Sequence, residues 1–138
     1  MAEAQGLMAG KRGLIMGLAN NRSIAWGIAT ALHDAGAEIA LTYQGEALKK
    51  RVEPLAEKLD AIVVGDCDVT DEASIDAAFD VLEQKWGKID FVVHAIAFSD
   101  KEELTGRYVD TSPENFAKTM QISCFSLASV TRRAEKLM

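Results

Sequence analysis

The hydrophobic residues of this chain fall into four short runs, separated by longer stretches in which apolar positions recur every three or four residues. The short runs are rich in Ile, Val, Leu and Phe without regular polar alternation, which predicts strands buried on both faces of a parallel sheet. They are GLIMG (13–17), EIALTYQ (38–44), AIVVGDCDV (61–69) and DFVVHAIAF (90–98). The intervening stretches predict helices at Ser23–Ala35, Gly45–Leu59 and Asp71–Trp86.

A fourth helix is predicted to begin at Ser112-Pro113-Glu114, because a capping serine followed by proline and an acid is typical of a helix start. Apolar side chains then recur at helical spacing: Phe116, Met120, Cys124, Leu127 and Val130. This stripe needs a partner, and the sequence leaves open whether it packs on the sheet or against a neighbouring subunit.

The order β-α-β-α-β-α-β-α predicts a Rossmann-like, doubly wound parallel sheet of the α/β class, with right-handed crossovers. We expect residues 1–138 to form a single, incomplete dinucleotide-binding domain, because the pattern stops at its fourth helix whereas such sheets normally continue with further strands. Only the first few residues are expected to fray.

Charge and composition narrow the range of partners. The net charge is −6 and no block of Lys or Arg is longer than three residues, which argues against binding to nucleic acid or to an anionic membrane surface. The longest uncharged stretch, 119–131, is too short and too polar to span a bilayer, and no signal peptide is recognisable, so we expect a cytoplasmic protein. Cys67 and Cys124 have neither metal-ligand nor disulfide spacing, and both are expected to be buried thiols.

The first strand-to-helix turn, GLANNRSIAWGIA (17–29), has the chemistry of a phosphate-binding loop. Gly17 ends the strand, and a helix starting near Ser23 offers unpaired N–H groups and a partial positive charge. Small residues let a ligand approach, and Gly27 is expected to let the helix pack closely on the sheet. The spacing departs from G-x-G-x-x-G, so a glycine-containing turn with a capping serine is the alternative.

Three further strand ends fit a nucleotide site, and one of them, HAIAF (94–98), has small residues where a ribose and a nicotinamide would lie. Gln44 lies where a dinucleotide fold carries the residue that meets the adenosine ribose, Asp68 can accept from an adenine amino group, and Val69 can pack on the ring. Each also has a structural explanation, as a polar strand end or as part of the cap that Thr70 or Asp71 gives the next helix. His94 is expected to be a core histidine satisfied by backbone groups rather than a catalytic base.

Together these segments resemble the bacterial enoyl-acyl-carrier-protein reductases of fatty-acid biosynthesis, a divergent branch of the short-chain dehydrogenase/reductases. The resemblance runs along the whole chain as an N-terminal half and rests on the G-x5-S-I-A pattern of 17–25, CDVTDEASIDAAF and DFVVHAIAFSDKEELTGRYVDTS. It implies cofactor contacts at Gly17, Ser23, Ile24, Gln44, Asp68, Val69 and Ile96, and an acyl-substrate contact at Ser99. Gln44 without a following basic pair is similar to the members that use NADH. Ala97 stands where many members have glycine.

The same resemblance implies a reaction and an assembly. Members are typically homotetramers that reduce a trans-2-enoyl thioester on acyl carrier protein, with NADH giving a hydride to the β-carbon, a tyrosine stabilising the enolate oxygen and a lysine holding the ribose. This chain does not contain the segment with that tyrosine and lysine, so no catalytic residue is assigned and the chain alone is expected to be inactive. Tyr43 and Lys50 match the Y-x6-K spacing, but Tyr43 is expected on the adenosine side; Tyr108 is expected to be a packing residue.

Two other functions fit parts of the pattern. A short-chain dehydrogenase/reductase acting on a carbonyl would share the fold, but the loop at 17–25 departs from the usual loop of that superfamily. A non-catalytic NAD-binding fragment would need the chain to be stable with one edge of its sheet uncovered.

Overall fold

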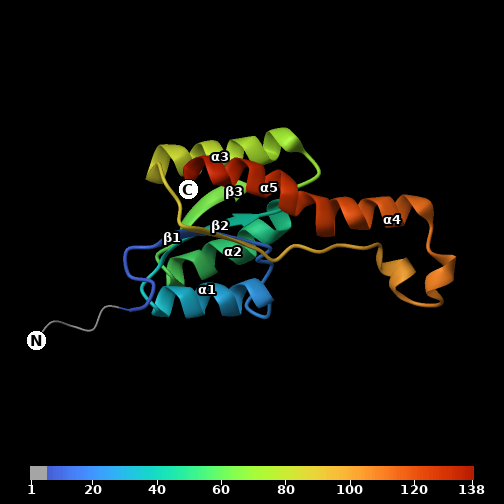
Figure 1. Cartoon of the computed structure of the whole chain (residues 1–138). Helices are drawn as coiled ribbons and strands as arrows, with labels where there is room; N and C mark the ends of the chain where they lie inside the picture. Colours follow the sequence, from blue (N-terminus) through green and yellow to red (C-terminus); the bar gives the residue numbers. More distant parts are fainter. Residues whose placement is uncertain (1–5) are drawn as a thin grey trace, which may run out of the picture.

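A four-stranded parallel sheet in the order β3-β2-β1-β4 lies at the centre of the molecule (Figure 1). The computed structural model describes residues 6–138, so the fraying expected of the first few residues lies outside it. The strands are β1 (Arg12–Met16), β2 (Glu38–Tyr43), β3 (Ile62–Asp66) and β4 (Phe91–His94). Gly13 of β1 aligns with Ile39 of β2 and with Phe91 of β4. This order confirms the predicted Rossmann-like topology and places its switch point between β1 and β4.

Helices cover both faces of the sheet (Figure 1). One face carries α1 (Ile24–Asp34) and α2 (Glu46–Lys58), and the other carries α3 (Glu72–Trp86) and α5 (Ser126–Ala134). In β1, Leu14 and Met16 belong to the core beneath α3 and α5, whereas Ile15 belongs to the core beneath α1 and α2. All three are fully buried, because successive side chains of a strand point to opposite faces and both faces are covered. This explains the apolar runs without polar alternation.

Each predicted apolar run extends further than its strand. Residues 17, 44, 67–69 and 95–98 were included in the predicted strands but lie beyond the last paired residues. Several of these residues line a cleft instead of pairing with a neighbouring strand. The apolar residues among them, such as Val69 and Ile96, therefore form part of a cavity wall, and a run of apolar residues in the sequence does not distinguish such a wall from a strand.

The last helical segment is continuous but not uniform. It consists of α4 (Pro113–Met120), a π-helical turn (Gln121–Phe125) and α5. Ser112 begins it as predicted, since its hydroxyl oxygen accepts from the Asn115 N–H at 3.1 Å. No helix within residues 6–138 has the length and apolar character that crossing a bilayer requires.

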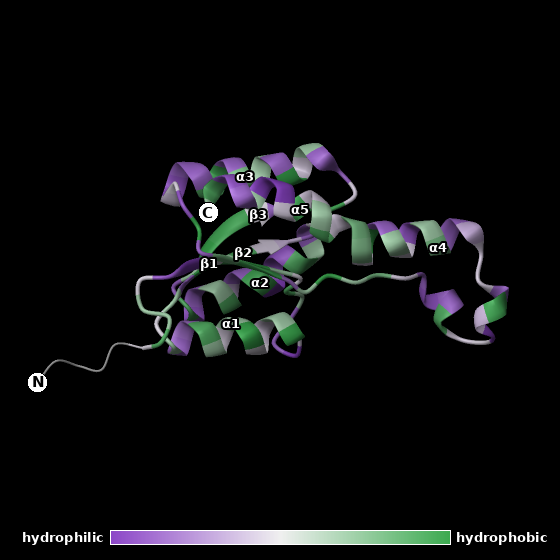
Figure 2. Cartoon of the chain, in the orientation of Figure 1, coloured by the Kyte–Doolittle hydropathy of each residue, from purple (hydrophilic) through white to green (hydrophobic). Residues whose placement is uncertain are grey.

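The apolar stripe predicted on this segment divides into two parts. Val130 is 1% exposed and packs on the sheet, whereas Phe116 and Leu127 are about half exposed. Figure 2 shows apolar residues along α4, which projects beyond the sheet. Cys124 is exposed as well, so the expectation that both cysteines are buried is wrong for this one. Packing on the sheet therefore satisfies only the C-terminal part of the stripe.

Candidate functional site

A cleft of about 480 Å³ opens where the carboxyl ends of the four strands meet. It lies across the switch point between β1 and β4, which is where ligands bind in open α/β sheets. Five of the predicted site residues line it: Gly17, Gln44, Asp68, Val69 and Ile96. The other three, Ser23, Ile24 and Ser99, do not line it.

Gly17 is the first residue of the turn between β1 and α1 and lies against the segment that follows β4. Its backbone has a φ of +100°, and a Cβ built on it would lie 1.9 Å from the carbonyl oxygen of Ala95. Ala95 is held there because its N–H donates to the Met16 carbonyl at 3.1 Å. Only glycine both adopts this conformation easily and lets the turn pass the end of β4 so closely.

Ser23 precedes α1 but its hydroxyl does not cap the helix. The Oγ atom accepts instead from the N–H groups of Ala19 at 3.0 Å and Asn20 at 3.1 Å. By contrast, Asp71 caps α3 by accepting from the Ala73 N–H at 3.0 Å. The Trp26 and Gly27 N–H groups donate to the Ser23 carbonyl oxygen, whereas those of Ile24 and Ala25 have no acceptor from this serine and remain available to an anionic ligand.

Two other residues of this turn lie outside the cleft lining. Ile24 is 80% exposed, and its predicted cofactor contact stays a prediction. A Cβ at Gly27 would meet nothing within 4 Å, and the residue is exposed, so the prediction that Gly27 permits close packing on the sheet is wrong. The buried face of α1 is formed instead by Ala25 and Ala29, whose small side chains bring the helix close to the strands.

Gln44 lies exposed at the end of β2, at the rim of the cleft. The next residue, Gly45, donates its N–H to the Asp66 carboxylate at 2.9 Å. A carboxylate therefore stands beside Gln44, and no basic side chain of the described residues lines this end of the cleft. This carboxylate would repel an additional phosphate group placed beside it.

Asp68 uses only one of its two carboxylate oxygens in hydrogen bonds to other side chains and N–H groups. Its Oδ1 atom accepts from the N–H of Thr70 at 2.9 Å and from the Thr70 hydroxyl at 2.7 Å. The second oxygen has no partner among the described side chains, so it can accept from a ligand. The helix-cap explanation belongs to Asp71 rather than Asp68. Val69 is buried and contributes an apolar patch to the same wall.

Cys67 also lines the cleft, and it is buried as predicted. Burial is the largest cause that raises the pKa of its thiol, and together with the neighbouring carboxylates of Asp66 and Asp68 it brings that pKa to about 11. The group is therefore a neutral thiol at physiological pH and packs as a small apolar side chain.

His94 and Ser99 flank the segment that follows β4. The His94 Nε2 atom lies 2.7 Å from the Ser126 hydroxyl, so a side chain rather than the predicted backbone group satisfies this half-buried histidine. The Ser99 hydroxyl lies 3.0 Å from both Asn115 Nδ2 and Thr119 Oγ1. Ser99 thus holds the segment against α4 and does not itself face the cleft.

Neither tyrosine of the chain has a lysine beside it in the cleft. Tyr43 lines the cleft at the end of β2, while Lys50 is exposed on α2 and contributes nothing to the wall. Tyr108 is 81% exposed, so its prediction as a packing residue is wrong.

Sequence reasoning missed the part of the wall that comes from the last helical segment. Lys118 and Ile122 line the cleft together with Phe98. The Lys118 ammonium lies 2.6 Å from Asp100 Oδ1 and 5.6 Å from the centre of the Phe98 ring. No local pattern signals these residues, because their place in the cleft depends on how the helix packs across the sheet.

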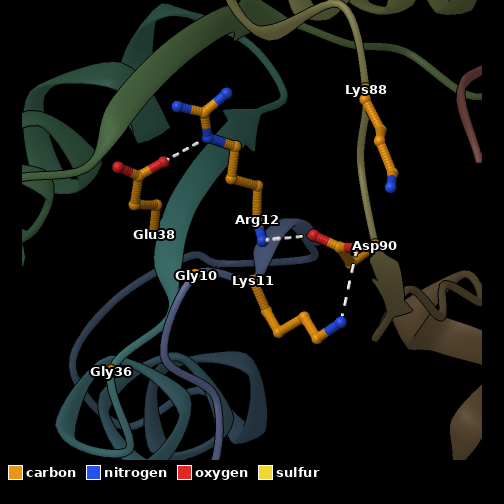
Figure 3. A pocket seen from close by; sticks show the side chains of 7 residues that line it. All are labelled: Gly10, Lys11, Arg12, Gly36, Glu38, Lys88 and Asp90. Carbon is orange, nitrogen blue, oxygen red and sulfur yellow. Dashed lines mark hydrogen bonds and ion pairs between the residues drawn. The ribbon is translucent and has the colours of Figure 1, made fainter. Parts of the chain in front are cut away.

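A second hollow, of about 390 Å³, lies at the opposite, amino ends of the strands (Figure 3). Its charges largely neutralise one another: Arg12 pairs with Glu38, and Lys11 lies 3.9 Å from Asp90. The Arg12 N–H also donates to Asp90 at 2.9 Å. These contacts join β1 to β2 and to the start of β4, which is a structural role.

Comparison with known proteins gives a consistent match. Residues 17–138 match the protein family described as enoyl-(acyl carrier protein) reductase. The chain is 72% identical over 138 residues to the enoyl-(acyl-carrier-protein) reductase (NADH) 1 of Rhizobium meliloti (strain 1021), covering all of this chain and 51% of the relative. It is 53% identical over 133 residues to the enoyl-(acyl-carrier-protein) reductase (NADH) FabI of Rickettsia felis, covering 96% of this chain and 51% of the relative.

Solved structures with the same fold give the same picture. The enoyl reductase of Anaplasma phagocytophilum, solved in complex with NAD, is 55% identical with a TM-score of 0.92, over 97% of this chain and 51% of that one. FabI from Candidatus Liberibacter asiaticus is 51% identical with a TM-score of 0.94, over 98% of this chain and 52% of that one. The chain spans about half the length of the curated relatives it matches.

Proposed function

This chain belongs to the enoyl-(acyl carrier protein) reductase family, and from that premise we propose that it binds NADH in the cleft at the carboxyl ends of β1–β4. We infer further that the protein reduces trans-2-enoyl thioesters carried on acyl carrier protein, a step of fatty-acid biosynthesis. The observation that carries the proposal is the 480 Å³ cleft at the switch point, with the uncapped start of α1 beside it.

The start of α1 fits the diphosphate of the cofactor. Gly17 leaves room for a ligand to approach the turn, and the N–H groups at Ile24 and Ala25 begin the helix without a side-chain acceptor. In this proposal Ile24 acts through its backbone, since its side chain is exposed. Ser23 acts indirectly, because its hydroxyl fixes the shape of the turn through Ala19 and Asn20.

The ends of β2 and β3 fit the adenosine part. The free oxygen of Asp68 would accept from the adenine amino group, and Val69 would pack on the ring. Gln44 would meet the ribose, and the adjacent Asp66 carboxylate disfavours the additional phosphate of NADPH. These contacts support NADH as the preferred cofactor.

The segment after β4 fits the nicotinamide part, with Ile96 and Ala97 lining the cleft. When bound there, NADH supplies the hydride for the reduction. The contribution of the chain's own residues is to bind and orient the cofactor. Ser99 supports the substrate side by fixing this segment to α4, and no tyrosine or lysine of the chain is assigned a catalytic role.

Three wider features remain part of the proposal. Residues 1–138 would form part of one dinucleotide-binding domain, since β4 is paired on one side only within residues 6–138. The exposed apolar residues of α4 support a homotetramer, and the expected location is the cytoplasm.

The proposal is tested by titrating the chain with NADH and with NADPH while the nicotinamide fluorescence is followed. Saturable binding with NADH preferred is the expected result. Absence of any binding would remove the proposed cofactor site. For the activity, the complete protein is assayed with a crotonyl thioester, and failure to oxidise NADH in that assay would overturn the assigned reaction.

A further inference from the structure

We propose that His94 and Ser126 form a positioning pair that fixes the width of the cleft between the segment after β4 and the π-helical turn. Through that width the pair sets the affinity for the cofactor. The inference rests on the proposed function only in naming NADH as the ligand of the cleft, because the hydrogen bond between His94 and Ser126 is formed by the chain's own residues.

The pair joins two elements that are far apart in the sequence. His94 is the last residue of β4, and Ser126 is the first residue of α5, fully buried. Their side chains meet at 2.7 Å, His94 Nε2 to Ser126 Oγ. This hydrogen bond lies at the end of β4, where the chain leaves the sheet and begins to line the cleft. The lining residues that follow are Ala95, Ile96, Ala97 and Phe98.

The direction of the hydrogen bond follows from the partners of the serine. Its hydroxyl donates to the Ile122 carbonyl at 2.7 Å, one turn earlier in the helix. A hydroxyl has one hydrogen, so the Ser126 oxygen can only accept from His94, and the histidine must carry its proton on Nε2. The chain of donors therefore runs from His94 to Ser126 to Ile122.

This chain of hydrogen bonds ends on a residue of the opposite wall. Ile122 lines the cleft from the π-helical turn, and both Ile122 and Ile96 pack against the same core. A serine that donates to the carbonyl four residues earlier bends a helix, and π-helical turns are frequent at functional sites. Ser126 thus connects the π-helical turn, through the Ile122 carbonyl, to the end of β4, through His94.

A serine within the π-helical turn holds the far end of the wall. The Phe98 N–H donates to Ser123 Oγ at 3.0 Å, and the Ser123 hydroxyl lies 3.2 Å from the Phe98 carbonyl oxygen. The segment from 94 to 98 is therefore tied to the last helical segment at both ends, to Ser126 of α5 at one end and to Ser123 of the π-helical turn at the other. Loss of either tie would allow the two walls to separate.

Substitutions at His94 and Ser126 test the pair in the full chain. Ser126→Ala removes the acceptor, and His94→Asn removes the donor because its amide is too short to reach. His94→Gln is the conservative variant, since its terminal amide nitrogen can occupy the place of Nε2. Ser129→Ala is the matched control: Ser129 is another buried serine of α5, but its hydroxyl bonds to Glu72, away from the cleft.

Two readouts are measured after thermal unfolding has shown that each variant is folded. The first is the dissociation constant for NADH, from fluorescence titration. The second is the amide hydrogen exchange of residues 95–98, which requires no cofactor. We expect Ser126→Ala and His94→Asn to weaken NADH binding about tenfold, which corresponds to the loss of one hydrogen bond, and to speed the exchange of residues 95–98. His94→Gln should stay within about twofold of the parent chain.

The possible outcomes separate this inference from the proposed function. Ser129→Ala should lower the unfolding temperature and leave both readouts unchanged. The pair is overturned if Ser126→Ala leaves exchange at 95–98 unchanged, or if Ser129→Ala matches its effect. A parent chain that does not bind NADH contradicts the proposed function, and the exchange measurement still decides the pair.

Discussion

Gly17 lies so close to Ala95 that a methyl group on its α-carbon would come within 1.9 Å of the Ala95 carbonyl oxygen. The two residues belong to the turn after β1 and to the segment after β4, which are 78 positions apart. Their contact closes the floor of the cleft at the switch point of the sheet.

Gly17→Ala is predicted to destabilise the chain strongly. The side chain would meet a backbone atom, which cannot move out of the way like a flexible side chain, and the left-handed φ alone costs about 1–2 kcal/mol for a residue with a Cβ. Urea unfolding followed by circular dichroism measures the change in the free energy of unfolding. The matched control is Gly27→Ala, in an exposed helical position with open space around the Cβ, which should stabilise by about 0.5–1 kcal/mol. Equal effects at the two glycines would contradict the close approach at Gly17.

Asp66→Asn is predicted to reduce the preference for NADH over NADPH. The Asp66 carboxylate accepts from the Gly45 N–H beside Gln44, so removing its charge lessens the repulsion of an additional phosphate. The ratio of the two dissociation constants should shift by several-fold at low salt and less at high salt, because exposed charges are screened. Asp80→Asn makes the same charge change on an exposed position of α3 away from the cleft. A shift of the same size in that variant would assign the effect to net charge.

Arg133 is predicted to make the stability of the chain depend on pH in the acidic range. Its guanidinium hydrogen bonds hold the pKa of Glu72 below its ordinary value of 4.5 and that of Asp76 below 3.8. Carboxylates with lowered pKa stabilise the folded state above their ordinary values, and this stabilisation is lost as the pH falls through the lowered values. As the pH is lowered below about 4.5, the free energy of unfolding should therefore decrease, and it should decrease less steeply in Arg133→Met.

Arg132→Met is the control for this prediction. Arg132 lies 3.5 Å from Glu72 but its side chain is 61% exposed, compared with 12% for Arg133. The exposed pair should contribute little to the pH dependence. Identical pH profiles for the parent chain and Arg133→Met would show that this cluster does not link α3 to α5 in solution.

The two cysteines are predicted to differ in reactivity. Cys67 is buried with a pKa raised to about 11, so almost none of it is thiolate at neutral pH, whereas Cys124 is exposed. A thiol reagent such as iodoacetamide should therefore modify Cys124 in the native chain and Cys67 only after unfolding. Mass spectrometry of the modified peptides gives the site directly. Rapid native labelling of Cys67 would mean that the wall of the cleft opens in solution.

The sequence alone determined the elements, their order and the strand ends that bear the site. The apolar runs and the three- and four-residue spacing report local conformation and burial directly, so β1–β4 and the helices follow from them. Gly17, Gln44, Asp68, Val69 and Ile96 could be placed together because the carboxyl ends of parallel strands meet at one edge of the sheet.

Only the tertiary structure decided how the side chains of that edge are used. Lys118 and Ile122 enter the cleft, the Ser23 hydroxyl faces back into its turn, and the stripe of the last helical segment is half exposed. The bond between His94 and Ser126 joins residues 32 positions apart. Each of these depends on which distant residue occupies the neighbouring space, and a local pattern of hydrophobic and polar positions holds no information about that neighbour.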